Sequence, residues 1–227
     1  MLLSILQLVL FFNRVSSFPF SLFDSSEDVL GVDLSFLGEK AFKNPDPEVG
    51  KRLENWNASS SENPEELGEY AQGDILLPKE LNRNGLIGNS FRWKAGVIPY
   101  EIVGFFLPSQ LSAIQAAMDL YHTYTCVSFK QKSSSDKDFI SISNSGTGCW
   151  SSVGKKGGRQ DVNLQTPACT TRVGTVVHEL MHAAGFLHEQ SRPERDDYIT
   201  IVWQNIKEGV TKTILKKVKS LKLTRLV

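Results

Sequence analysis

The eleven residues from position 178 to position 188 constrain this chain more than any other stretch. They read His-Glu-Leu-Met-His-Ala-Ala-Gly-Phe-Leu-His. His178 and His182 are four positions apart, so on a helix their imidazoles point to the same side. Gly185 lets the chain leave the helix through a backbone conformation that other residues avoid, and such a turn can bring His188 back toward the other two histidines. The spacing therefore predicts a helix and a turn that surround one point.

Three histidines around one point have the spacing of a metal site. Three neutral imidazoles with an open fourth position are the ligand set of a catalytic zinc ion rather than a structural one. Glu179 follows the first histidine and can reach a zinc-bound water without being a ligand itself. A short H-E-x-x-H pattern also occurs by chance, and a helix with two histidines is often ordinary surface or core. Here three of the four histidines of the chain fall in this stretch, which favours the metal site.

The first residues predict export. Residues 2–12 are almost wholly apolar and too short to span a bilayer. Small residues follow at Val15-Ser16-Ser17, so residues 1–17 are predicted to be a cleaved signal peptide, although a basic n-region is missing. A buried apolar helix is the alternative. The 25 basic and 25 acidic residues cancel, so charge indicates no nucleic-acid partner, and we expect no stable membrane insertion.

Cysteine usage agrees with an oxidising compartment. Cys149 and Cys169 flank a glycine-rich stretch and could close a modest loop, which leaves Cys126 over. An odd cysteine in an exported chain needs an explanation.

Residues 18–83, called the front segment below, are acidic and interrupted by prolines. Such a segment is expected to be extended and to lie on another part of the chain; the alternative is an ordinary acidic linker, which spacing alone favours. The segment contains one glycosylation sequon, Asn57-Ala58-Ser59. It also contains Gly73-Asp74, a carboxylate on a flexible backbone, and a turn at Arg83-Asn84 where a trypsin-like protease could cut.

From Phe91 onward the pattern is that of a packed domain. Strand composition occurs in residues 93–106, 126–129, 139–143 and 161–165. Apolar residues at helical spacing predict a helix after Pro108, and Thr170 or Thr171 can cap the helix that carries the metal motif. This order predicts an α+β fold with a mixed, mostly antiparallel sheet, a backing helix and an active-site helix. The fourth histidine, His122, is expected to be a structural or surface residue rather than a ligand.

Several motifs together resemble the astacin family of zinc metalloproteases, a branch of the metzincins. The resemblance is nearly continuous over residues 84–209, which implies the N-terminal part of an astacin-like catalytic domain. It is carried by Gly96-Val97-Ile98-Pro99-Tyr100, Thr125-Cys126-Val127-Ser128-Phe129, Gly148-Cys149-Trp150-Ser151-Ser152-Val153-Gly154, Val177-His178-Glu179-Leu180-Met181-His182-Ala183, and the run from Gly185 to Glu189 with Arg192, Arg195, Asp196 and Tyr198 beyond it.

The resemblance implies a function and a set of roles. A secreted, extracellular endopeptidase would hydrolyse protein or peptide substrates with one zinc ion held by His178, His182 and His188, and Glu179 would be its general base. The front segment, as a propeptide, would place Asp74 in the open position of the zinc ion and keep the enzyme latent. A trypsin-like protease would cut between Arg83 and Asn84, and Glu189 would be the partner of the new N-terminus. Cys149 and Cys169 match a disulfide of the family.

The chain also departs from the family pattern. Members carry a methionine turn and a closing cysteine in a C-terminal subdomain, whereas the methionines here are Met1, Met118 and Met181. We therefore expect that subdomain to be largely missing and Cys126 to lack its family partner. Residues 210–227 form a basic tail, which could be a membrane-surface amphipathic helix or, in the favoured interpretation, an alternative splice end or a misread frame. Two hypotheses remain: a zinc endopeptidase made as a zymogen, or an inactive secreted fragment that acts by binding or not at all.

Overall fold

The structure is a computed structural model, and it describes residues 43–77, 92–191 and 195–206. The predicted signal peptide, the predicted cut at Arg83 and Asn84, and the basic tail lie outside the described residues.

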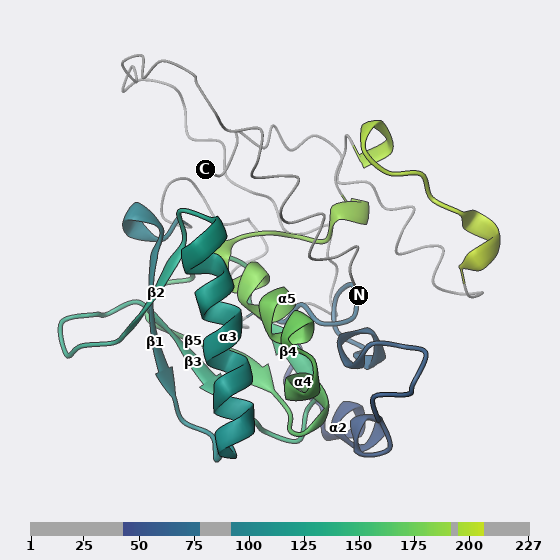
Figure 1. The fold of residues 1–227 in the computed structure, drawn as a ribbon, viewed down its shortest axis with the longest axis horizontal. Coiled ribbons are helices and arrows are strands. Elements are labelled where there is room, and N and C mark those ends of the chain that lie inside the picture. Colours follow the sequence, from purple (N-terminus) through teal and green to yellow (C-terminus); the bar gives the residue numbers. More distant parts are fainter. Residues whose placement is uncertain (1–42, 78–91, 192–194, 207–227) are drawn as a thin grey trace.

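One sheet of five strands forms the centre of the domain, in the order β2-β1-β3-β5-β4 (Figure 1). Its strands are β1 (Val97–Ile102), β2 (Ser128–Gln131), β3 (Phe139–Ser143), β4 (Cys149–Ser151) and β5 (Arg159–Leu164). Strand β1 is parallel to β2 and β3, and β3 is parallel to β5. Strand β4 is antiparallel to β5.

The sheet is mixed, as predicted, but it is mainly parallel, so the prediction of a mostly antiparallel sheet was wrong. Helix α3 (Pro108–Tyr124), which has 17 residues, connects β1 to β2. A crossover of this length carries the chain back to the end of the sheet where the previous strand began, which makes the two strands parallel. The apolar pattern of a strand does not depend on its direction, so the sequence pattern could not reveal this.

Helix α3 and helix α5 (Val173–Ala184) lie side by side on one face of the sheet (Figure 1). Apolar side chains three and four positions apart on α3, including Ile114, Met118 and Tyr121, are buried, as the helical spacing predicted. The Tyr121 hydroxyl donates a hydrogen bond to the Val177 carbonyl at 2.8 Å. This contact joins the backing helix to the helix with the metal motif.

The hydrophobic core lies between the sheet and these two helices. Side chains from β1, β3, β5, α3 and α5 are at most 1% exposed there: Ile98, Ile140, Ile142, Val162, Leu164, Ile114, Met118, Val176 and Leu180. The Trp93 indole N–H donates to the Ala183 carbonyl at 2.8 Å. Helix α5 is therefore fixed along its length, and the direction of its polar side chains is set by the core.

The start of α5 differs from the prediction. Thr170 and Thr171 belong to a separate short helix, α4 (Ala168–Thr171), and both hydroxyls donate to the carbonyl of Pro167. They close the turn of α4 and do not cap the next helix. Arg172 is the N-cap residue of α5 and makes no side-chain cap hydrogen bond.

The described part of the front segment packs on the domain, but it is not simply extended as predicted. Helix α2 (Pro47–Glu54) begins after Asp46, whose carboxylate accepts the Glu48 N–H at 2.9 Å. Val49 and Leu53 of this helix are buried. The Gln165 side-chain amide donates to the Gly50 carbonyl at 2.9 Å. The short amphipathic pattern of α2 was too brief to stand out among prolines and acidic residues.

The fourth histidine is remote from the metal motif. His122 is exposed, and its Nε2 accepts the Phe129 N–H at 2.8 Å, which ties α3 to β2. Its exposure and this local contact agree with the expectation of a structural or surface histidine. Among the described residues, no helix combines the length and the apolar character that crossing a membrane requires.

Candidate metal centre

Helix α5 presents two histidines on one side, and the turn after it supplies the third. Gly185 ends the helix with φ 120°, a conformation that side chains with a Cβ rarely adopt, and its N–H bonds to the carbonyls of Met181 and His182. The chain then reverses and returns His188 to the first two rings. The helix and turn predicted from the spacing are therefore present.

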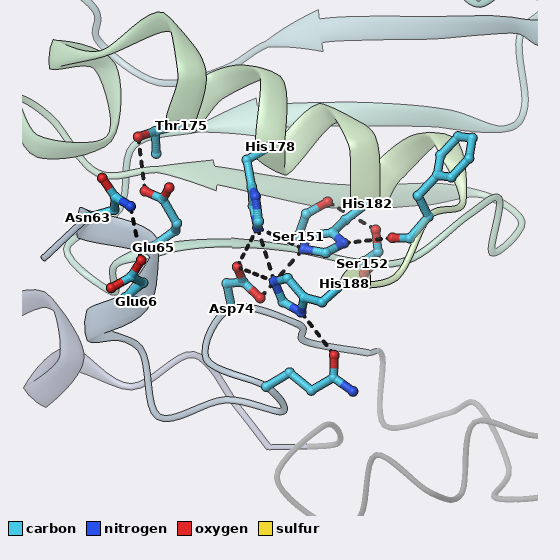
Figure 2. A network of polar contacts seen from close by, with 12 residues as sticks. Asn63, Glu65, Glu66, Asp74, Ser151, Ser152, Thr175, His178, His182 and His188 are labelled. Atoms are coloured by element: carbon cyan, nitrogen blue, oxygen red, sulfur yellow. Dashed lines mark hydrogen bonds and ion pairs between the residues drawn. The ribbon is translucent and has the colours of Figure 1, made fainter. Parts of the chain in front are cut away.

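The three imidazoles converge on one point (Figure 2). Nε2 of His178 lies 3.1 Å from Nε2 of His182 and 3.2 Å from Nε2 of His188. A tetrahedral zinc ion with bonds of about 2.0–2.1 Å to nitrogen would hold its ligand atoms about 3.3 Å apart. The spacing of the ring nitrogens is therefore close to that of a zinc site.

Asp74 of the front segment completes the group. Its Oδ2 lies 2.8 Å from Nε2 of His178 and 3.2 Å from Nε2 of His188, and its Oδ1 lies 3.5 Å from Nε2 of His182. Ligand atoms of these four residues all lie within 4.8 Å of one another. Three imidazoles and one carboxylate form a zinc ligand set.

Two of the rings have their tautomer fixed by carbonyl-type acceptors. Nδ1 of His182 donates to the Phe186 carbonyl at 2.7 Å, and Nδ1 of His188 donates to Oε1 of Gln72 at 2.9 Å. Because these oxygens can only accept, the proton of each neutral ring is on Nδ1 and the lone pair of Nε2 points into the cluster. These two lone pairs and the Asp74 carboxylate come from ligand atoms that lie within 4.8 Å of one another, and they repel unless a proton or a cation lies between them. The donor set therefore fits a metal ion.

Asp74 is held in place by backbone pairing as well as by the histidines. It is 2% exposed. Its carbonyl accepts the Ser151 N–H at 3.0 Å, and the Leu76 N–H donates to the Ser151 carbonyl at 3.0 Å. The front segment thus adds a short parallel bridge to β4, between Ile75 and Ser151. Burial opposes the charge on Asp74, but His188 and His182 hold the pKa of the carboxyl well below its usual range.

Glu179 is the second carboxylate at the cluster. It is 0% exposed, and within the described residues neither of its carboxylate oxygens has a hydrogen-bond partner. Burial, followed by the nearby charges of Asp74 and Glu65, raises the pKa of Glu179 well above its usual range. A buried carboxylate without a donor is costly, so its position beside three converging histidines indicates a chemical role rather than a structural one.

A second set of contacts joins the front segment to the start of α5. Arg172 donates to Oδ1 of Asn63 at 3.0 Å and to the Ala58 carbonyl at 2.7 Å, and its guanidinium lies 5.4 Å from the centre of the Trp56 ring. One turn further along, Thr175 donates to Oε2 of Glu65 at 2.9 Å (Figure 2). Burial raises the pKa of Glu65.

Sequence reasoning did not identify Gln72, Glu65, Arg172 or Thr175. Thr175 could have been found, because it lies three positions before His178 and therefore on the same face of the helix. The front-segment residues carry no such periodic signal. Conversely, Glu189 lies in a 3₁₀ helix (Glu189–Ser191), but the residue predicted to be its partner is outside the described chain.

The cysteines behave as the resemblance implied. Cys149 and Cys169 form a disulfide with 5.7 Å between their Cα atoms. The bond joins β4, the strand that pairs with the front segment, to α4. Cys126 is free and exposed in the described structure.

Comparison with known proteins agrees with this geometry. Helix α5 carries two histidines and a buried glutamate, and the turn after it brings a third histidine to the same point, which is the arrangement of a zinc peptidase in an α+β domain. The profile of the Astacin peptidase family matches residues 86–225. The chain therefore belongs to the astacin family. The match extends past residue 209, where the resemblance in motifs ends, and includes most of the basic tail.

Individual relatives cover the same region. The chain is 45% identical over 153 residues to zinc metalloproteinase nas-4 of Caenorhabditis elegans, an alignment with 63% of this chain and 48% of that protein. It is 42% identical over 147 residues to meprin A subunit beta of Rattus norvegicus, and that alignment covers 64% of this chain and 20% of that protein. The chain thus spans about half or less of the length of these relatives.

Among solved structures, high choriolytic enzyme 1, a hatching enzyme zinc-protease from Oryzias latipes, is 37% identical, with a TM-score of 0.48. That alignment covers 55% of this chain and 64% of the other.

Proposed function

We propose that this chain is the latent form of a secreted zinc metalloendopeptidase. The observation that carries the proposal is the position of Asp74, whose carboxylate lies against the three converging histidines while the front segment is paired to β4. A carboxylate in that position occupies the place that a reacting water and a substrate carbonyl would need. The front segment therefore acts as a propeptide, and membership of the astacin family supports the peptidase activity.

His178, His182 and His188 are the proposed zinc ligands of the active enzyme, and Asp74 is the additional ligand of the latent form. A zinc ion held by these residues would lower the pKa of a water molecule and would polarise a peptide carbonyl. Glu179 accepts a proton from the attacking water and delivers it to the leaving amine. The water oxygen bonds to the carbonyl carbon, the carbon–nitrogen bond breaks, and a carboxylate and an amine are released.

The backbone pairing at the edge of β4 favours a polypeptide as the substrate. The N–H and carbonyl of Ser151 both pair with the backbone of the front segment, through the carbonyl of Asp74 and the N–H of Leu76. When the front segment leaves, the same groups are available to another extended chain. Main-chain pairing of this kind recognises peptides of many sequences, so we propose protein or peptide substrates.

Activation requires removal of the front segment. A cut between Arg83 and Asn84 by a trypsin-like protease would separate Asp74 from the catalytic domain covalently, and the new N-terminus would pair with Glu189. The predicted signal peptide, residues 1–17, would have directed the chain to the extracellular space.

A direct test compares the full chain before and after treatment with trypsin. We expect peptide hydrolysis only after the cut, and we expect a zinc chelator to abolish it. Glu179→Gln should eliminate turnover while the zinc content is unchanged, because Glu179 is not a ligand. The matched control is Glu101→Gln on β1, which changes a carboxylate that pairs with Lys132 and Arg159 away from the histidines and should leave turnover intact.

The opposite result has a clear meaning. If the folded, zinc-loaded and correctly cut protein, separated from the front segment, shows no chelator-sensitive hydrolysis, the peptidase proposal is wrong for this chain. The remaining hypothesis would then be an inactive secreted protein that acts by binding.

A further inference from the structure

We propose that Asn57 carries an N-linked glycan, and that this glycan is present on the latent form alone. The proposal rests on the proposed export of the chain, because the modification takes place in the secretory pathway. Asn57-Ala58-Ser59 is the single N-x-S/T sequence in the 227 residues. A sequon is used only where the folded chain can display the sugar, so the decisive question is how this turn is arranged.

The turn displays its asparagine to solvent. Asn57, Ala58 and Ser59 are all exposed, and they lie just after α2 in a turn in which the Ser60 N–H donates to the Asn57 carbonyl at 2.9 Å. A glycan attached at this point would extend into water rather than into the core. The folded protein can therefore accommodate it without displacing any packed side chain.

The hydrogen bonds of the Asn57 side chain are compatible with modification. Its Oδ1 accepts the Ser59 N–H at 3.0 Å and also accepts the Ser59 hydroxyl. The oxygen remains an acceptor after glycosylation, since the sugar is attached to Nδ2. Both of these bonds use the oxygen, so attachment at the nitrogen breaks neither of them. The turn can thus keep its geometry with the glycan in place.

The covalent step uses a lipid-linked oligosaccharide pyrophosphate as donor. A bond forms between Nδ2 of Asn57 and the anomeric carbon of the oligosaccharide. The bond from that carbon to the pyrophosphate oxygen breaks, the lipid pyrophosphate leaves, and one amide proton is lost. No oxidant or reductant takes part.

The turn belongs to the front segment, so a glycan on Asn57 would be part of the latent form. The carbonyl of the next residue, Ala58, accepts the Arg172 guanidinium N–H at 2.7 Å, which fixes the turn beside the N-terminal end of α5. Asn57 also precedes the predicted cut at Arg83, and no other sequon follows it. Activation would therefore remove the glycan together with the front segment, and residues 84–227 would carry no N-linked sugar.

The experiment expresses the full chain in a eukaryotic secretory system in two versions, one with its own first 17 residues and one with an unrelated signal peptide. Treatment with a peptide N-glycosidase in heavy-oxygen water should produce a single mobility shift and a labelled aspartate at position 57. Asn57→Gln and Ser59→Ala should abolish the shift, whereas Ser59→Thr should retain it. Asn55→Gln is the matched control, because Asn55 is an exposed asparagine two positions away outside any sequon.

The two versions separate the possible failures. If the chain with the unrelated signal peptide reaches the medium without a sugar at position 57, the glycosylation proposal is overturned. If only the version with its own leader fails to be exported, the proposed export is wrong, and the other version still decides whether Asn57 is a competent acceptor. After trypsin treatment, the shift should be confined to the released front segment, and a shift in the catalytic fragment would contradict the assignment to the latent form alone.

Discussion

Arg172 offers a test of how strongly the front segment is bound to the rest of the domain, at a position away from the metal site. Its guanidinium makes two hydrogen bonds, to Asn63 and to the Ala58 carbonyl, and lies over the Trp56 ring. Each hydrogen bond at this half-exposed site should contribute about 0.75–1 kcal/mol, and the cation–π contact about 0.5–1 kcal/mol. Arg172→Ala should therefore weaken the attachment of this part of the front segment by about 2–3 kcal/mol. That free energy corresponds to a roughly 30- to 150-fold larger open population.

Native-state hydrogen exchange measures this population directly. The N–H groups of Trp56, Ser60 and Glu66 bond within the turns that Arg172 contacts. Their exchange should accelerate by roughly the same 30- to 150-fold, while amides of β3 and β5 should keep their protection because the core is unchanged. Arg172→Lys should give an intermediate effect, since lysine retains the charge but loses the planar pair of donors.

The matched control is Arg159→Ala on β5. This arginine pairs with Asp161 and lies near Glu101, not against the front segment, so exchange of the Trp56 amide should be unaffected. The reasoning is refuted if Arg172→Ala leaves the three amides at their original rates. It is also refuted if protection falls equally in β3 and β5, because Arg172 would then support the whole domain rather than this attachment.

Further predictions concern the metal site, the disulfide and the pH dependence. Asp74→Ala should give chelator-sensitive hydrolysis before any cut, measured on a fluorogenic peptide, and continued latency would contradict the assigned switch. Chelation of zinc should lower the melting temperature of the latent form, because an ion that binds only the folded chain stabilises it in proportion to RT ln(1 + [Zn]/Kd). Replacing both Cys149 and Cys169 by serine opens a loop with a sequence separation of 20 and should reduce the free energy of unfolding by about 3 kcal/mol in denaturant titrations. Burial lowers the pKa of Lys156 from 10.5 to about 7. Between these two pH values the unfolded chain binds more protons at Lys156 than the folded chain does. The free energy of unfolding should therefore rise with pH in this range, by at most about 1.4 kcal/mol per pH unit. Lys156→Met should flatten that slope.

Local spacing explains why the converging histidines could be predicted from the sequence. His178 and His182 are related by one helical turn, and Gly185 supplies the conformation that ends the helix. These relations involve neighbours in the chain, so no knowledge of the tertiary fold was needed. The position of Asp74 came from resemblance to a family, and the structure independently places its carboxylate against the three rings.

Long-range contacts explain what could not be predicted. Arg172 and Asn63 are separated by 109 positions, Thr175 and Glu65 by 110, and His188 and Gln72 by 116. Single polar residues at such separations leave no periodic pattern. The direction of the strands was equally hidden, because a parallel and an antiparallel strand can bury the same apolar side chains.

The proposed latent form depends on position as much as on affinity. A free carboxylate would lose its translational freedom on binding to the histidines. Asp74 does not, because the backbone on which it lies is already paired with Ser151 through the carbonyl of Asp74 and the N–H of Leu76. The same backbone is anchored further back, since the Tyr70 hydroxyl donates to the Thr147 carbonyl at 2.7 Å and the Gln165 amide bonds to Gly50 in α2. None of these contacts is broken by a cut at Arg83. Cleavage therefore removes only the covalent tether, and release of Asp74 must await the opening of a non-covalent interface whose stability is set by residues remote from the metal.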